Sequence, residues 1–381
     1  MTASGAGIHI PSFRVILMNI TIPSGREEIT VNKPPVAASA APLRDEGLVE
    51  FAADGLDACP RLHDTIRNAG GDDEQNSSLD GTSFRFGSYR QLLTLLHRLQ
   101  KELLREETDR IRFRFQYGEN PLPWSPLSSL FETVGGRGVT EYILHRYFTT
   151  HLQPIVQPNG QIVGYECLLR PLPEQAPFRP SELFEKARKI GQHSFLDREA
   201  RHAAIRMSSS HLPAGMKRFV NFLPSSLYCT ETCLRGTFEA IEETGTDPAD
   251  IVFEVAETER LDHPEMWSIF DQYRRRGIRL AVDDSGADGD NFGLIEGLKP
   301  DYVKLDRNWV SGCDRDPEKQ RHIENLLERA ARFHGVVLAE GVEREPEWHW
   351  LRQAGVPLFQ GYLFGLAAPV PAPAARTLSR I

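Results

Sequence analysis

The chain has 381 residues, 40% of them hydrophobic and 25% charged, and its formal net charge is −9. This length predicts about two domains, and the acidic balance argues against duplex nucleic acid as the main partner, because phosphate contacts need a basic surface. No apolar run approaches the roughly 20 residues that cross a bilayer, and the five scattered cysteines indicate reduced thiols, so we expect a cytoplasmic protein without membrane insertion.

The N-terminal third is expected to hold an arm and a small module. Residues 1–45 include a Pro/Ala tract and have too little to bury, which predicts a mostly disordered arm. Residues 46–125 predict a small α+β module, for which we consider a regulatory role. Within it, Thr82–Phe86 predicts a strand, Ser88 is a good N-cap for the helix that follows, and the strict alternation over Arg110–Tyr117 predicts a half-buried strand.

The remaining chain has the pattern of a barrel. Residues 126–144 are expected to form a linker with a lead-in helix, and residues 371–381 a C-terminal tail. Over 145–370, short apolar segments alternate with amphipathic helices, which predicts an α/β, TIM-like (β/α)8 barrel. The expected strands are Leu152–Val156, Ile162–Leu168, Arg218–Phe222, Ile251–Val255, Ile278–Val282, Tyr302–Leu305, Val336–Ala339 and Pro357–Phe359. The first two form a hairpin around Asn159 and Gly160, so one barrel strand is expected to be antiparallel.

Polar residues occur at or just inside the ends of these strands, one strand after another. They are Glu166, Asn221, Glu254, Asp283, Asp284, Lys304, Glu340 and Gln360. A lone acid there is usually a helix cap or a salt bridge, but in a closed barrel the strand ends converge on one mouth. Oxygen ligands of this kind select Mg²⁺ or Mn²⁺ over zinc. So many acids suggest two ions about 3.5–4 Å apart, as used in phosphoester displacement.

Eight short segments carry a family resemblance. In order and spacing, QPIV, YECLLR, VNFLP, FEVAE, VDD, VKLD, LAEGVE and FQGYLFG are similar to the EAL family of cyclic-di-GMP phosphodiesterases, over residues 145–370. Cysteine replaces the usual alanine of the signature triplet, at Cys167. The resemblance implies an EAL-type barrel that hydrolyses cyclic-di-GMP to linear pGpG by a water activated with two Mg²⁺ or Mn²⁺ ions. It also leaves open a homodimer formed through the barrel.

The resemblance further implies a role for each matched position. The implied metal ligands are Glu166, Asn221, Glu254, Asp283 and Asp284, with Asp283 bridging the two ions. Lys304 would hold or polarise the attacking water, Glu340 would be a base or outer-shell acid, and Glu166 is counted with them as catalytic. The implied contacts to the cyclic dinucleotide are Gln153, Arg170 and Gln360, and Glu257 would anchor the loop after the Asp pair.

The loop over 285–291 departs from the family pattern DDFGxGYSS. The aromatic residue after the Asp pair is replaced by Ser285, the second glycine by Asp288 and the tyrosine by Gly289. We therefore keep two further interpretations beside the enzyme: a non-hydrolytic cyclic-di-GMP receptor with a degenerate loop, and an interaction scaffold that has lost ligand binding. The complete set of acids favours the enzyme, whereas the altered loop favours the receptor.

Overall fold

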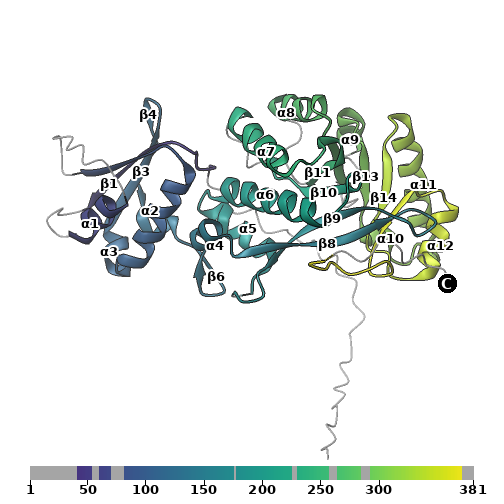
Figure 1. Ribbon diagram of the computed structural model, residues 1–381, viewed down its shortest axis with the longest axis horizontal. Coiled ribbons are helices and arrows are strands. Elements are labelled where there is room, and N and C mark those ends of the chain that lie inside the picture. Colours follow the sequence, from purple (N-terminus) through teal and green to yellow (C-terminus); the bar gives the residue numbers. More distant parts are fainter. Residues whose placement is uncertain are drawn as a thin grey trace, which may run out of the picture. The chain divides into compact units, whose positions relative to one another are not determined.

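A computed structural model describes residues 41–53, 60–69, 81–175, 177–224, 230–256, 264–284 and 292–370 (Figure 1). The predicted arm up to residue 40, the tail over 371–381, the loop over 285–291 and Glu257 lie outside these residues, as do the side chains of Asp283 and Asp284. Within the described ranges, none of the helices combines the length and the hydropathy that a membrane span requires.

The N-terminal module is a small sheet with helices packed on its apolar face. The sheet has the order β2-β1-β3-β4, with β5 paired to β3, and its strands are β1 Gly47–Ala53, β2 Gly81–Phe86, β3 Ile111–Tyr117, β4 Asn120–Pro121 and β5 Ser125–Pro126. The helices are α1 Pro60–Asn68, α2 Tyr89–Glu102 and α3 Arg105–Arg110. Alternation places Ile111, Phe113 and Phe115 in the core, and Ser88 caps α2 by accepting from the backbone N–H of Gln91.

The segment predicted as a linker is packed rather than extended. It contains the 3-10 helix η2 Leu127–Leu130, the hairpin strands β6 Thr133–Val134 and β7 Arg137–Gly138, and α4 Val139–His145. Its apolar side chains belong to one buried cluster that runs from Leu43 in the predicted arm, through the module, to Leu196 in the barrel helix α6. The prolines and glycines of this segment mark turns inside a continuous core, not a gap between two cores.

The barrel is closed and has eight strands, as predicted. The strand order is β10-β11-β12-β13-β14-β15-β8-β9. The strands are β8 Phe148–Val156, β9 Ile162–Pro171, β10 Lys217–Asn221, β11 Ile251–Ala256, β12 Arg279–Asp284, β13 Tyr302–Leu305, β14 Val336–Ala339 and β15 Leu358–Gln360. Strand β8 is antiparallel to both β9 and β15, and the remaining pairs are parallel. The fold class predicted from the sequence is therefore confirmed.

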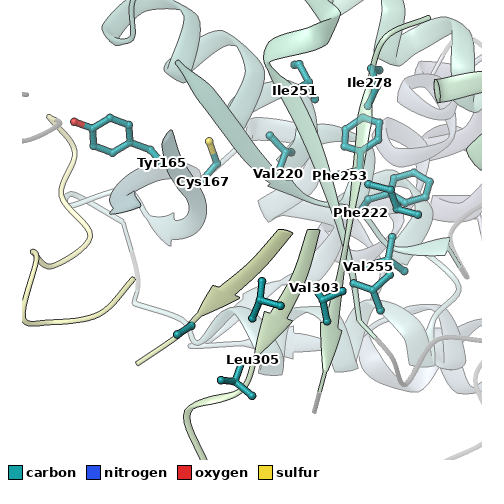
Figure 2. Packing of buried hydrophobic residues seen from close by; sticks show 14 of the residues in the cluster. Tyr165, Cys167, Val220, Phe222, Ile251, Phe253, Val255, Ile278, Val303 and Leu305 are labelled. Carbon is teal, nitrogen blue, oxygen red and sulfur yellow. The ribbon is translucent and has the colours of Figure 1, made fainter. Parts of the chain in front are cut away.

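Helices follow the strands and surround the barrel (Figure 1). They are α5 Pro180–Lys189, α6 His193–His211, α7 Thr230–Thr244, α8 Pro264–Arg275, α9 Phe292–Leu298, α10 Arg307–Val310, α11 Pro317–Arg332 and α12 Glu345–Gln353, with the 3-10 helix η4 Pro248–Asp250 before β11. Outward-facing strand residues such as Val220, Phe253 and Val303 pack under these helices (Figure 2). This large apolar layer fixes the strands in register and so fixes where their carboxyl ends point.

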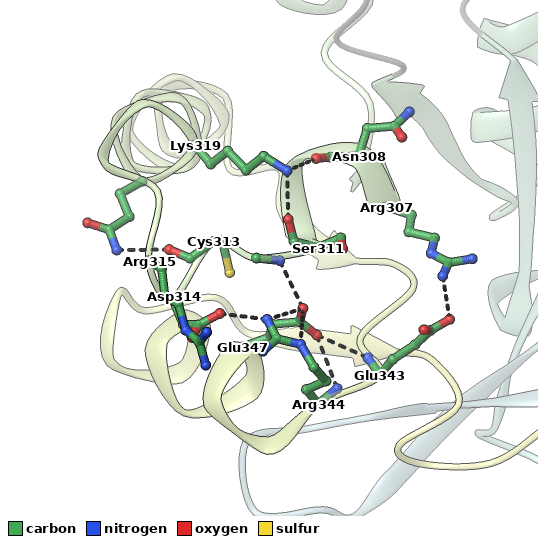
Figure 3. Close-up of polar contacts among 12 residues, drawn as sticks. Arg307, Asn308, Ser311, Cys313, Asp314, Arg315, Lys319, Glu343, Arg344 and Glu347 are labelled. Carbon is green, nitrogen blue, oxygen red and sulfur yellow. Dashed lines mark hydrogen bonds and ion pairs between the residues drawn. The ribbon is translucent and has the colours of Figure 1, made fainter. Parts of the chain in front are cut away.

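A polar cluster secures the segment after β14 to the helices around it. The buried carboxylate of Glu347, in the first turn of α12, accepts the backbone N–H groups of Gly312 at 2.9 Å, Glu343 at 3.3 Å and Arg344 at 3.1 Å (Figure 3). The guanidinium of Arg344 bonds to the same carboxylate and also reaches Asp314 at 2.7 Å. Burial opposes the charge of Glu347, but these donors outweigh it and lower the pKa of its carboxyl group.

Replacing Glu347 with Gln should destabilise the protein in a pH-dependent way. Because the folded-state pKa is below the ordinary value, Glu347 stabilises the fold above that ordinary value, and the contribution is lost as pH falls through the lowered pKa. We expect a loss on the order of 3 kcal/mol at pH 7, shrinking below about pH 4. Chemical denaturation of both proteins across this range measures it. Glu345→Gln, an exposed acid of the same turn, is the control, and an equal loss there would contradict the assignment.

Candidate active site at the barrel mouth

Alternation along the strands builds the site in two layers. An inner apolar cluster contains Phe219, Val252, Ala281, Tyr302, Leu338 and Leu358, one residue from each of β10 to β15. Two residues further along the same strands lie Asn221, Glu254, Asp283, Lys304, Glu340 and Gln360. Because successive strand residues point to opposite faces, a polar layer follows the apolar one at the carboxyl ends of the strands. This is the position expected for a barrel active site.

Lys304 is the centre of the polar layer. Its Nζ lies 2.7 Å from Glu254 Oε1, 2.5 Å from Glu340 Oε1 and 3.6 Å from Glu166 Oε1. The side chains of Lys304 and Glu254 are only 4% and 1% exposed, whereas that of Glu340 is 26% exposed. A buried ammonium and buried carboxylates are tolerated only when they are paired in this way. The lysine therefore holds three acids from three different strands around one point.

Glu166 is kept charged at this point by its neighbours. Its Oε2 accepts a hydrogen bond from Gln360 Nε2 at 2.6 Å, and the same amide nitrogen lies 3.2 Å from Gln153 Oε1. Burial disfavours the charged form, but Lys304 and the hydrogen bond from Gln360 outweigh burial and lower the pKa of the Glu166 carboxyl group. Glu166 is thus an ionised acid with oxygen lone pairs aimed into the barrel mouth.

The other predicted site residues fall around this group. Asn221 Nδ2 lies 3.4 Å from Glu254 Oε2 on the neighbouring strand. In the backbone register, Asp283 lies opposite Lys304 and Asp284 opposite Leu305, so the Asp pair ends β12 beside the lysine strand. Arg170 is not in the hydrogen-bonded group: its Nη1 donates to the Leu169 carbonyl at 2.8 Å. It lines an adjoining cavity instead.

That cavity has a volume of about 290 Å³ and touches the site on one side. Arg170, Asn221 and Glu254 lie on its wall. Sequence reasoning did not identify the opposite wall, which α5 and α6 supply with Ser181, Phe184, Arg188, Asp197 and Arg201. In the sequence these charges look like the solvent face of two amphipathic helices, and no motif marks them. Mostly apolar walls with a few polar groups are typical of a site for a small molecule.

Cys167, which departs from the usual signature, lines the same cavity. Burial raises the pKa of its thiol, and the nearby charges of Glu254 and Glu166 raise it further. The side chain is therefore protonated at neutral pH and behaves as a small apolar group. The substitution leaves Glu166, its neighbour in the strand, in the polar layer.

The donor set suits a hard divalent cation. Carboxylate and amide oxygens converge from β9, β10 and β11, and Gln360 Oε1 is buried without a hydrogen-bond partner among the described residues. Among the side chains that the structure describes, no three His, Cys, Asp or Glu residues form a cluster able to hold a metal ion. The side chains of Asp283 and Asp284 are not among them, and the register places Asp283 opposite Lys304. The chemistry of the donors nevertheless fits Mg²⁺ or Mn²⁺.

An eight-stranded barrel with one antiparallel strand and acids at successive strand ends defines the structural class. The EAL domain model matches residues 139–367, more than half of the chain, and the chain belongs to the EAL domain family. This agrees with the resemblance seen in the sequence and extends it slightly toward the N-terminus, to the start of α4.

Named relatives match about three fifths of the chain. The chain is 27% identical over 244 residues to the probable cyclic di-GMP phosphodiesterase PdeN of Escherichia coli K12, covering 62% of this chain and 46% of the relative. It is 26% identical over 227 residues to the blue light- and temperature-regulated antirepressor BluF of the same organism, covering 59% and 55%. The chain thus spans about half the length of these curated relatives.

Two solved structures match a similar share of the chain. The manganese and cyclic-di-GMP complex of Klebsiella pneumoniae BlrP1 superposes with a TM-score of 0.54 at 27% identity, covering 58% of this chain and 56% of that one. A standalone EAL protein from Vibrio cholerae, in its c-di-GMP-bound form, gives a TM-score of 0.52 at 29% identity, covering 59% and 94%.

Replacing Lys304 with Met should destabilise the protein at neutral pH. It leaves the buried carboxylates of Glu166 and Glu254 without their cation, at a cost of about 3 kcal/mol or more. Lys304 is the largest of the influences that lower the pKa of Glu166, so its removal moves that pKa upward. A carboxyl group with a raised folded-state pKa destabilises less as pH falls, so the deficit should shrink between about pH 7 and pH 5.

Thermal unfolding of the Lys304→Met protein and of the unchanged chain at both pH values checks this. The matched control is Lys189→Met, which removes an exposed pair with Glu185 and should change stability by less than about 1 kcal/mol at either pH. A Lys304→Met deficit that is independent of pH would contradict the assignment.

Proposed function

We propose that the barrel hydrolyses cyclic-di-GMP to linear pGpG with two Mg²⁺ or Mn²⁺ ions. The observation that carries the proposal is the group formed by Lys304, Glu166, Glu254 and Glu340 at the barrel mouth, beside the cavity lined by Arg170. Membership of the EAL domain family supports the substrate, and so do relatives and solved structures whose names carry cyclic-di-GMP. Because those relatives are matched over about half their length, the substrate remains a proposal for this chain.

The residues at the barrel mouth would have three roles in the proposed reaction. Glu166, Asn221, Glu254, Asp283 and Asp284 would hold the ions, which supply positive charge at the reacting phosphate when bound. Lys304, whose ammonium lies between the acids, would hold the attacking water by hydrogen bonding. Glu340 is the most exposed of the three acids around Lys304 and is therefore the best placed to take the proton of that water.

The substrate contacts follow from the same geometry. Gln360 bonds to both Glu166 and Gln153, so it connects an acid of the polar layer to a residue expected to face the dinucleotide. Arg170 carries a guanidinium on the cavity wall, and guanidinium groups suit bidentate binding of phosphate. Burial of part of the ligand against Phe184 would supply apolar contact area for a base.

Divalent-dependent hydrolysis is the direct test. The full chain, stripped with EDTA and resupplied with Mn²⁺ or Mg²⁺, should convert cyclic-di-GMP to pGpG, and product separation measures it. Glu166→Gln should lower turnover at least about 100-fold because it removes a charge from the ion-binding group. Glu318→Gln, an exposed acid at the start of α11, should leave turnover unchanged. Full activity of Glu166→Gln would refute the assignment.

The receptor alternative rests on the loop over 285–291, whose sequence departs from the family pattern. Asp288 and Asp290 add negative charge to the segment that follows the Asp pair, which disfavours a ligand with two phosphates, and Gly289 replaces the tyrosine of the family pattern. We therefore expect slow hydrolysis in the unchanged chain, with a steep dependence on divalent concentration.

Restoring the family pattern with Ser285→Phe, Asp288→Gly and Gly289→Tyr should raise turnover more than it changes affinity. Product formation against Mn²⁺ and equilibrium binding with Ca²⁺ should be measured on both proteins. Brisk hydrolysis by the unchanged chain with no gain on restoration would remove the argument about the loop. Binding by both proteins with hydrolysis by neither would establish the receptor in place of the enzyme.

A further inference from the structure

The first half of α6 carries charged side chains that are buried. Asp197, Arg198, Glu199 and Arg201 are 3, 7, 1 and 2% exposed. Burying a charge is costly unless it is paired, and each of these residues reaches a different part of the chain. Arg198 binds Asp45 at 2.8 and 3.0 Å, and Glu199 binds Tyr89, Arg146 and Arg90. Asp197 and Arg201 point the other way, to the site.

Asp197 connects α6 to the chain that follows β10. Its Oδ1 accepts the backbone N–H of Leu223 at 3.0 Å, and its Oδ2 forms a close ion pair with Arg201. Leu223 lies two residues after Asn221, in the segment that leaves the barrel mouth. The residue between them, Phe222, donates its own N–H to the Glu254 carbonyl at 2.9 Å. The backbone around Asn221 is thus held on one side by β11 and on the other by Asp197.

Arg201 holds the carboxylate of Asp197 in place. Its Nε donates to Thr237 Oγ1 in α7 at 3.2 Å, and its guanidinium lies 5.1 Å from the centre of the Phe222 ring. An Asp–Arg pair four residues apart needs no burial to stabilise a helix. Here both partners are buried, and both line the cavity together with Asn221 and Glu254. Helix stabilisation alone does not account for the bond to Leu223.

We propose that Asp197 is a positioning residue, which orients Asn221 toward the divalent ion and the cyclic dinucleotide by holding the backbone at Leu223. The inference rests on the proposed function, because it concerns the same site. Asp197 is not proposed to touch either ligand. It acts through the backbone, and the ion pair with Arg201 holds its carboxylate in place.

A double-mutant cycle tests the proposal. Asp197→Ala and Asn221→Ala, alone and together, are compared in cyclic-di-GMP binding with Ca²⁺ and in Mn²⁺-dependent turnover. If Asp197 acts through Asn221, each single change should weaken binding about tenfold or more, and the double variant should be no weaker than Asn221→Ala alone. Asp197→Asn, which keeps an oxygen for the Leu223 N–H, should recover most of the lost affinity. Arg206→Gln removes an exposed ion pair between the same helix and Glu243 and should leave affinity unchanged.

A readout independent of activity accompanies the cycle. Amide hydrogen exchange of peptides that contain Leu223 should quicken in Asp197→Ala and not in Arg206→Gln. Additive losses in the cycle, or unchanged affinity in a folded Asp197→Ala protein, would overturn the positioning role and leave the proposed function intact. No binding of cyclic-di-GMP or Mn²⁺ by the unchanged chain would overturn the proposed function, and the positioning role with it.

Discussion

The arrangement at the barrel mouth depends on one buried ammonium. Lys304 lies among Glu166, Glu254 and Glu340, acids from strands that are far apart in sequence and that would repel one another without it. Each acid is costly to bury alone, so the lysine stabilises the convergence of the strand ends. The apolar layer below, from Phe219 to Leu358, excludes water from one side of the group and strengthens the pairing. The polar layer therefore contributes to the stability of the closed barrel.

The barrel could be predicted from the sequence because its strands are short, apolar and buried on both faces. Tyr302–Leu305 and Val336–Ala339 have the predicted bounds. Lys304 and Glu340, which follow apolar residues of these two segments, mark the barrel mouth. The module was harder. Strand β1 and helix α1 went unpredicted because Gly47–Ala53 mixes small residues with Glu50 and because α1 has few apolar residues. Strand β1 is central in the sheet because it pairs with β2 on one side and with β3 on the other.

The least predictable contacts are those of α6, which supplies part of the wall of the site. Asp197, Arg198, Glu199 and Arg201 lie close together in the sequence, and such a run of charges normally marks a solvated helix face. Their partners Asp45, Tyr89, Arg146 and Leu223 come from four other segments. The sequence specifies the charges but not which of them meet, since that depends on how the module and β10 approach the same helix. Helix α6 begins at His193, and its first turn is buried in the core that the module shares.

Glu199, with its partners Tyr89, Arg90 and Arg146, and the apolar core around it limit how the module can be exchanged in evolution. Leu127, Leu130, Val139 and Ile143 belong to the same core as the module and as α5 and α6. A sensor that is attached by a tether can be exchanged by recombination at the tether. Here any exchange point between the module and β8 would cut through packed side chains, so an incoming module would have to bring a matching surface for α6. The two halves of the chain are thus constrained to diverge together rather than to be shuffled.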